Sequence, residues 1–111
     1  MTTGEFVTKV GLETLVLADT TKLIDGVYTG DLLSRAAGKL KRGNVWITIM
    51  NNVNVIAVAS LSGASCVILV ENIEAGEELV EKARAYGINL FRTEESSYET
   101  CCRLASILNH E

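Results

Sequence analysis

The stretch from residue 45 to residue 70, VWITIMNNVNVIAVASLSGASCVILV, constrains the fold most, because it contains no charged side chain. In the chain as a whole, 22% of the residues are charged. An uncharged stretch of this length either crosses a membrane or is buried in the core of a folded domain. The polar residues within it distinguish the two alternatives.

A membrane-spanning helix needs about 20 mainly apolar residues in a row. Here Asn51, Asn52 and Asn54 interrupt the run, and three amides would be costly in lipid. Divided at these positions, the stretch predicts a strand over 45–50, a helix over 53–61 that Gly63 ends, and a strand over 66–70. Strands that are apolar on both faces are typical of parallel sheets covered by helices. We therefore expect a protein core and no contact with a membrane.

The rest of the chain alternates in the same way. Further helices are predicted over 3–11, 31–40, 75–87 and 96–108, and further strands over 12–17, within 22–30 and over 88–92. The order is α-β-β-α-β-α-β-α-β-α. Such an alternation predicts one α/β domain over residues 1–111, with α/β/α layers and a mostly parallel sheet joined by right-handed crossovers.

Helical spacing indicates which side chains face the core. The inward positions predicted for the helices outside the uncharged stretch are Leu32, Leu33, Ala36, Ala37, Leu40, Leu79, Val80, Ala83, Tyr86, Cys101, Leu104, Ala105 and Leu108. Ser96 and Glu99 have the spacing of a capping box at the start of the last helix.

Charge and composition exclude several classes of protein. Ten basic and fourteen acidic residues give a net charge of −4, which argues against binding to a nucleic-acid backbone. The basic cluster at 39–42 is expected to complement the end of a helix.

Cys66, Cys101 and Cys102 lack the Cys-x-x-Cys spacing of a zinc site and are expected to be free thiols. Residues 1–10 do not resemble a signal peptide, so we expect a cytoplasmic protein.

The sequence predicts no catalytic residue, no metal ligand and no cofactor. The single histidine, His110, is the penultimate residue, where a catalytic role is not expected. Residues 30–40, GDLLSRAAGKL, differ from a phosphate-binding loop in glycine spacing, and Leu40 stands where that loop has a hydroxyl. An enzyme built from Asp31, Thr48, Asn51 and Thr93 is the least favoured hypothesis.

Polar residues follow several of the predicted strands. In open α/β sheets, ligands bind beyond the carboxyl ends of the strands. Glu71 and Asn72 also fall at such an end. The candidate ligand-binding residues are Asp31, Thr48, Asn51, Asn52, Thr93 and Ser96. Asn, Asp and Ser are also the usual residues at helix starts, so capping is the competing and stronger interpretation, including for Asp31 at the start of its helix.

Five segments together resemble the DRTGG domain, over residues 12–108. In order they are GVYTGDLLS, GNVWITI, NVNVIAVASL, CVILVENIEAGEELVEKARAYGINLFRT and SSYE. The resemblance implies a fold similar to the N-terminal domain of HPr kinase/phosphorylase. In the namesake motif, Thr21-Lys22 is placed opposite Asp-Arg, and Asp25-Gly26-Val27 opposite Thr-Gly-Gly. Many relatives have a Gln-Thr-His type of turn where this chain has residues 50–52.

The family occurs beside CBS domains in regulated pyrophosphatases and some phosphotransacetylases, and as small proteins encoded near iron-only hydrogenases. The resemblance therefore implies a non-enzymatic regulatory or protein-interaction module, a homodimer, with a link to redox, hydrogenase or energy metabolism. The alternative is a sensor of a small, nucleotide-like ligand bound at the strand ends. The partners expected are a second copy, another protein or a small metabolite.

Overall fold

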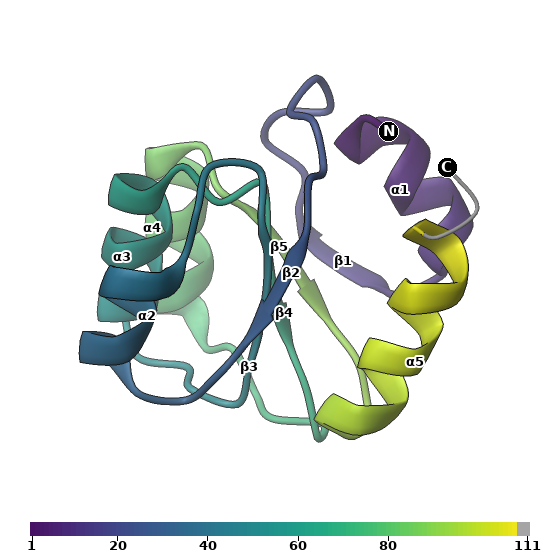
Figure 1. Ribbon diagram of the computed structural model, residues 1–111. Helices are drawn as coiled ribbons and strands as arrows, with labels where there is room; N and C mark the ends of the chain where they lie inside the picture. Colours follow the sequence, from purple (N-terminus) through teal and green to yellow (C-terminus); the bar gives the residue numbers. More distant parts are fainter. Residues whose placement is uncertain (109–111) are drawn as a thin grey trace.

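The computed structural model describes residues 1–108, and its elements follow the predicted order (Figure 1). The helices are α1 (Thr3–Val10), α2 (Leu33–Lys39), α3 (Asn54–Ser62), α4 (Glu77–Tyr86) and α5 (Ser97–Leu108). The strands are β1 (Glu13–Val16), β2 (Val27–Thr29), β3 (Val45–Thr48), β4 (Cys66–Leu69) and β5 (Asn89–Arg92). His110 lies outside the described residues.

The strands form one sheet in the order β1-β5-β4-β3-β2. The strands β2 to β5 are parallel, and β1 is antiparallel to β5. From β2 to β5 each crossover moves one strand in the same direction, and crossovers of one hand then place their helices on one side. Accordingly α2, α3 and α4 cover one face of the sheet, while α1 and α5 cover the other (Figure 1). The prediction of a layered, mostly parallel α/β fold is confirmed.

The uncharged stretch forms the middle of this sheet and one helix on it. It contains β3, α3 and β4, and every residue of both strands is buried. Gly63 ends α3 in the left-handed conformation, as predicted. Within residues 1–108, no helix has the length and apolar character to span a membrane. The prediction that this stretch is core is therefore confirmed.

Alternating side chains of the strands form two separate cores. Trp46 and Leu69 point toward α2, α3 and α4 together with Leu90 of β5. Ile47 and Ile68 point the opposite way. On that second face Phe6 and Phe91 pack edge to face with 6.0 Å between ring centroids. The two cores explain why β3 and β4 are apolar at every position.

Four helical side chains that were expected to face inward are exposed. Leu32 is 64% exposed because α2 begins only at Leu33, and Ala37 is exposed because this short helix buries Ala36 alone. Tyr86 ends α4 and is 53% exposed, with the ammonium of Lys82 5.4 Å from its ring centre. Ala105 of α5 is also exposed.

One buried amide fixes the connection between β1 and β2. The side chain of Asn89 accepts hydrogen bonds from the backbone N–H of Ala18 (2.8 Å) and of Asp19 (2.9 Å). It donates to the carbonyls of Asp19 and Ser65, both at 2.9 Å. Asn89 is fully buried. All its hydrogen-bonding groups are thus used to hold an irregular loop against the sheet.

Candidate functional site

The predicted site residues lie where β2 to β5 end, which we call the carboxyl edge (bottom of Figure 1). The residues divide into two groups. Asp31, Thr48, Asn51 and Asn52 follow or end β2 and β3, whereas Thr93 and Ser96 follow β5. The structure places the two groups at the same edge, but their side chains have different neighbours.

Asp31 and Thr48 are directly bonded. One carboxylate oxygen of Asp31 accepts hydrogen bonds from the hydroxyl of Thr48 (2.8 Å) and the backbone N–H of Ile49 (2.9 Å). The Thr48 hydroxyl also accepts from the N–H of Met50 (3.2 Å). The prediction that Asp31 begins a helix is wrong, because α2 has Leu32 as its N-cap residue. Asp31 instead joins the loop after β2 to the end of β3.

Asn51 and Asn52 line a cavity of about 520 Å³. The amide of Asn51 donates to the carbonyl of Glu74 at 2.6 Å. The side-chain oxygen of Asn52 accepts from the backbone N–H of Asn54 (3.0 Å) at the start of α3, as the capping interpretation predicts. Val53 and residues 75–79, where α4 begins, line the rest of the cavity. The N-cap residue of α4, Gly76, supplies no side-chain hydrogen bond.

A tight turn follows β4. Glu71 and Asn72 both have left-handed backbone conformations, with φ of 60° and 59°, and the N–H of Ile73 donates to the carbonyl of Val70 (3.3 Å). Backbone N–H groups of the turn also bond to the loop after β5, from Glu71 to the carbonyl of Glu95 (2.8 Å) and from Asn72 to that of Thr93 (3.0 Å). The turn is therefore fixed to its neighbour by backbone hydrogen bonds.

The side chain of Arg92 also binds this turn, a contact that the sequence did not predict. Its guanidinium donates to the carbonyls of Ile73 (2.7 Å) and Asn72 (2.9 Å), and to the side-chain oxygen of Asn72 (2.7 Å). It also forms an ion pair with Glu13 at 3.1 Å. Two of these four partners are backbone carbonyls, which every residue type carries, so no sequence motif indicates the contact.

Thr93 and Ser96 have structural roles in the loop before α5. The Thr93 hydroxyl accepts from the N–H of Glu95 at 3.1 Å. Ser96 and Glu99 form the predicted capping box, with bonds of 3.1 Å and 3.0 Å between side chain and backbone. Hydrogen bonding to the Arg103 side chain lowers the pKa of Glu95 below its usual value. These residues are not among those that line the Asn51–Asn52 cavity.

The topology explains where a crevice would form at this edge. After β4 the chain passes to one face as α4, and after the adjacent β5 it passes to the other face as α5. Such a divergence is the switch point at which open α/β sheets bind ligands. Here the bonds from Glu71 and Asn72 to the neighbouring loop bridge the crevice. One opening at this edge lies beside it, between the starts of α3 and α4.

The charge of the edge limits what it can bind. Glu71, Glu74, Glu77 and Glu78 are all exposed there. Four carboxylates disfavour an anionic group and favour a neutral polar or cationic one.

Within residues 1–108, no three His, Cys, Asp or Glu side chains are arranged to hold a metal ion. All three cysteines are free, and burial raises the pKa of the Cys66 thiol, which makes its thiolate scarce.

The fold is that of an α/β domain with a mostly parallel sheet, and comparison with known proteins identifies its family. The model of the DRTGG domain matches residues 11–107. The chain therefore belongs to the DRTGG domain family. No curated protein sequence matches it.

A solved structure has the same fold. It is the crystal structure of the CBS and DRTGG domains of the regulatory region of Clostridium perfringens pyrophosphatase, complexed with the activator diadenosine tetraphosphate. The TM-score is 0.72 at 13% sequence identity, and the match covers 88% of this chain and 43% of that one. The chain thus spans less than half of that protein, and the similarity concerns the fold.

The turn after β4 suggests another position for the glycines of the family's namesake motif. Two consecutive left-handed residues are the geometry in which Gly-Gly is favoured. Glu71 and Asn72 have this geometry. At residues 26 and 27, where the sequence alone places the two glycines, only Gly26 is left-handed and Val27 is already in β2. Residues 71 and 72 therefore have the backbone geometry that a Gly-Gly pair favours, and residues 26 and 27 do not.

Replacing Glu71 by glycine is expected to stabilise the protein. A left-handed conformation costs a non-glycine residue about 1–2 kcal/mol, which exceeds the entropy that glycine adds to the unfolded chain. We expect Glu71→Gly to raise the free energy of unfolding by about 0.5–1 kcal/mol in urea denaturation. Glu94→Gly, in the exposed loop after β5 and without positive φ, is the control and should be destabilising. A loss of stability in Glu71→Gly equal to that of the control would contradict the turn geometry.

Proposed function

We propose that the chain is a regulatory module that acts by binding a small polar ligand at the carboxyl edge and catalyses no reaction. The observation that supports this most directly is the cavity of about 520 Å³ that Asn51 and Asn52 line with the start of α4. Amide side chains and helix-start N–H groups suit a polar, uncharged ligand group such as a heterocyclic base. The solved relative was crystallised with an activator that carries two adenosines.

The remaining predicted residues are proposed to support this site. The bond between Asp31 and Thr48 fixes the end of β3, from which Asn51 and Asn52 extend. Thr93 and Ser96 fix the loop to which the β4 turn is bonded. Binding between α3 and α4 would therefore act on loops that are already linked to one another. Such a linked edge could pass a ligand signal to an adjoining domain or partner.

A thermal-shift screen with nucleosides, nucleotides and other metabolites tests the proposal. A ligand that binds only the folded state at 100 times its Kd adds about 2.7 kcal/mol of stability. We expect at least one neutral or weakly charged nucleoside-like compound to raise the Tm of the protein. In Asn52→Ala this ligand-induced rise should largely disappear, beyond any change in the Tm of the free variant.

Asn54→Ala is the matched control, because Asn54 is an exposed asparagine two positions along that does not line the cavity. It should keep the full rise. If no compound changes the Tm, or if Asn54→Ala loses the rise as completely as Asn52→Ala, the cavity is not the ligand site.

A homodimer is the second candidate, and the edge strand β2 favours it. Val27 of β2 is 40% exposed, and beside it lies a cavity of about 600 Å³ lined by Ile24, Cys101 and Leu108 among others. An exposed apolar strand edge is a surface on which a second copy can pair. Sedimentation velocity at micromolar concentration should show a dimer, and a monomer at every concentration would exclude it.

The proposed link to hydrogenase or redox metabolism rests on the family resemblance, and co-purification from a native host tests it.

A further inference from the structure

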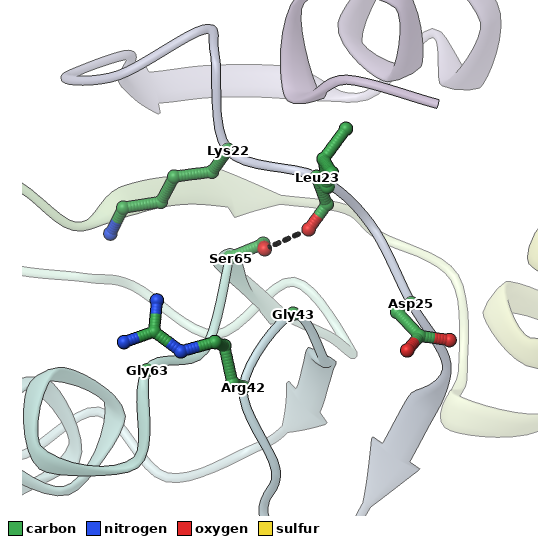
Figure 2. A pocket seen from close by; sticks show the side chains of 7 residues that line it. All are labelled: Lys22, Leu23, Asp25, Arg42, Gly43, Gly63 and Ser65. Carbon is green, nitrogen blue, oxygen red and sulfur yellow. Dashed lines mark hydrogen bonds between the residues drawn. The ribbon is translucent and has the colours of Figure 1, made fainter.

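Another cavity lies at the opposite end of the sheet, where β2, β3 and β4 begin, which we call the amino edge. Its volume is about 430 Å³. Figure 2 shows the residues that line it: Lys22, Leu23, Asp25, Arg42, Gly43, Gly63 and Ser65. They come from the segments before the three parallel strands. The proposed regulatory site at the carboxyl edge uses none of them.

Hydrogen bonds between the three segments build the wall of this cavity. The N–H of Asp25 donates to the carbonyl of Gly43 (2.7 Å), and the N–H of Gly43 donates to that of Gly63 (2.9 Å). The hydroxyl of Ser65 donates to the carbonyl of Leu23 (Figure 2). Gly43 has a φ of 88°, and a Cβ there would lie 3.1 Å from the Cβ of Asp25. The close approach therefore requires glycine, and the wall is preorganised.

Two cationic side chains line this wall together. The ammonium of Lys22 donates to the carbonyl of Gly87 at 3.3 Å. The guanidinium of Arg42 has no hydrogen bond or ion pair with any residue from 1 to 108. In Figure 2 both cationic groups extend to the same side, whereas the carboxylate of Asp25 lies on the other side. An anion between Lys22 and Arg42 would supply the opposite charge that the Arg42 guanidinium lacks.

The basic character continues into an adjoining cavity of about 400 Å³. This cavity shares Asp25 and Arg42 with the first and adds Lys39 and Lys41. Only Lys39 belongs to α2, so Lys41 and Arg42 lie beyond the helix end that this cluster was expected to complement. Four basic side chains thus line two cavities that share lining residues, in a chain of net charge −4. Asp25 is the one acidic residue that lines them.

We propose that these two cavities form a binding site for an oligophosphate, either as an inorganic chain or as part of a phosphate ester. The forked donors of Arg42 suit one phosphoryl group at the shared wall. Lys22 on one side and Lys39 and Lys41 on the other then suit its neighbours along the chain. A single phosphate could not reach the basic groups of both cavities at once, so we expect the site to favour two or more linked phosphoryl groups.

Titration of the ¹⁵N-labelled full chain with inorganic tripolyphosphate, followed by amide NMR, tests the proposal. We expect saturable shifts at residues 42–44 and 63–65, weakened by added salt. Orthophosphate should bind at least tenfold more weakly. Arg42→Gln should weaken tripolyphosphate binding about tenfold or more, as expected for the loss of a charge-assisted contact. Arg35→Gln, on α2 and outside both cavities, removes the same charge and should change the affinity less than twofold.

Titration with adenosine triphosphate distinguishes a nucleoside phosphate from an inorganic phosphate chain as the ligand. Tighter binding than tripolyphosphate, with an added shift at the exposed Leu23, assigns the site to a nucleoside phosphate. Equal binding assigns it to the phosphate chain alone. The proposal is overturned by the absence of saturable binding below about 10 mM, by equal losses in Arg35→Gln and Arg42→Gln, or by tripolyphosphate shifts confined to residues 51–54 and 76–79. The last result would leave a site at the carboxyl edge intact.

Discussion

Replacing Asn89 by alanine is expected to lower the free energy of unfolding by about 3–5 kcal/mol, because it leaves buried backbone groups without partners. The Asn89 side chain pairs with two N–H groups and two carbonyls across the loop at 18–19 and the start of β4. Each unpaired buried group costs about 1–3 kcal/mol, reduced where water can enter. Urea denaturation monitored by far-ultraviolet circular dichroism measures the change.

Two further variants test the reason for this loss. Asn54→Ala removes an exposed asparagine side chain and should change stability by less than about 0.5 kcal/mol. Asn89→Asp keeps the acceptor for Ala18 and Asp19 but loses the donors to Asp19 and Ser65, so it should also be strongly destabilising. Near-normal stability of Asn89→Ala would show that the loop at 18–19 is not held through this amide.

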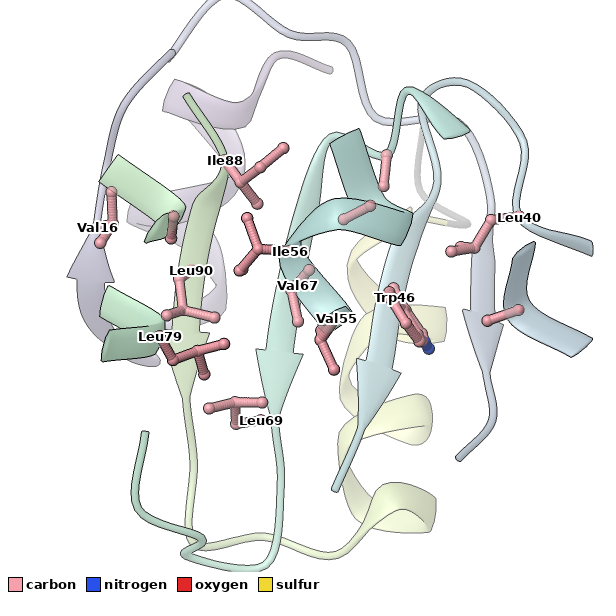
Figure 3. Close-up of a cluster of buried hydrophobic side chains, with 14 residues drawn as sticks. Val16, Leu40, Trp46, Val55, Ile56, Val67, Leu69, Leu79, Ile88 and Leu90 are labelled. Carbon is pink, nitrogen blue, oxygen red and sulfur yellow. The ribbon is translucent and has the colours of Figure 1, made fainter. Parts of the chain in front are cut away.

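Replacing Trp46 by alanine is expected to cost about 3–5 kcal/mol, the usual range for removing a large buried aromatic side chain. Trp46 is fully buried in the core between the sheet and α2 to α4 (Figure 3). Its indole N–H also donates to the carbonyl of Gly30 at 3.1 Å. The substitution therefore removes core packing and frees the residue that precedes Asp31.

Trp46→Phe separates the two effects. Phenylalanine retains much of the apolar contact but cannot donate to Gly30, so we expect a smaller loss of about 1–2 kcal/mol. Since Trp46 is the only tryptophan, chemical denaturation of these variants is followed by circular dichroism. If Trp46→Ala were as stable as the original protein, the indole would not be buried as the structure shows.

The order of helices and strands could be predicted from the sequence because local residue patterns mark where each element ends. Asn51 and Asn52 divide the uncharged stretch at the point where β3 ends, and Gly63 and Gly87 end their helices in left-handed conformations. Burial was less predictable at helix ends. Leu32 and Tyr86 have the right spacing, but Leu32 precedes the first turn of α2 and Tyr86 is the last residue of α4, and both side chains are exposed.

The site was predicted only in part, because its contacts join segments far apart in the sequence. The predicted polar residues do lie at or after strand ends, yet the bond from Thr48 to Asp31 and the contacts of Arg92 depend on strand order. The amino edge was not predicted as a site at all. Lys22 and the cluster at 39–42 are separated in sequence, and the order of β2, β3 and β4 brings their cavities together.

The two edges differ in chemistry, and this difference suggests a division of roles. The carboxyl edge is acidic and offers amide groups, whereas the amino edge offers four basic side chains. A ligand with a neutral heterocycle suits the first, and an oligophosphate suits the second. The two proposed sites share no lining residue.

Residue-by-residue amide hydrogen exchange tests the central claim most directly, namely that residues 45–70 form a buried strand, a covering helix and a second buried strand. The account predicts the slowest exchange in β3 and β4, slow exchange in α3, and faster exchange at residues 51–53 between β3 and α3. Uniform helical protection through the whole stretch, or rapid exchange throughout it, would contradict the account.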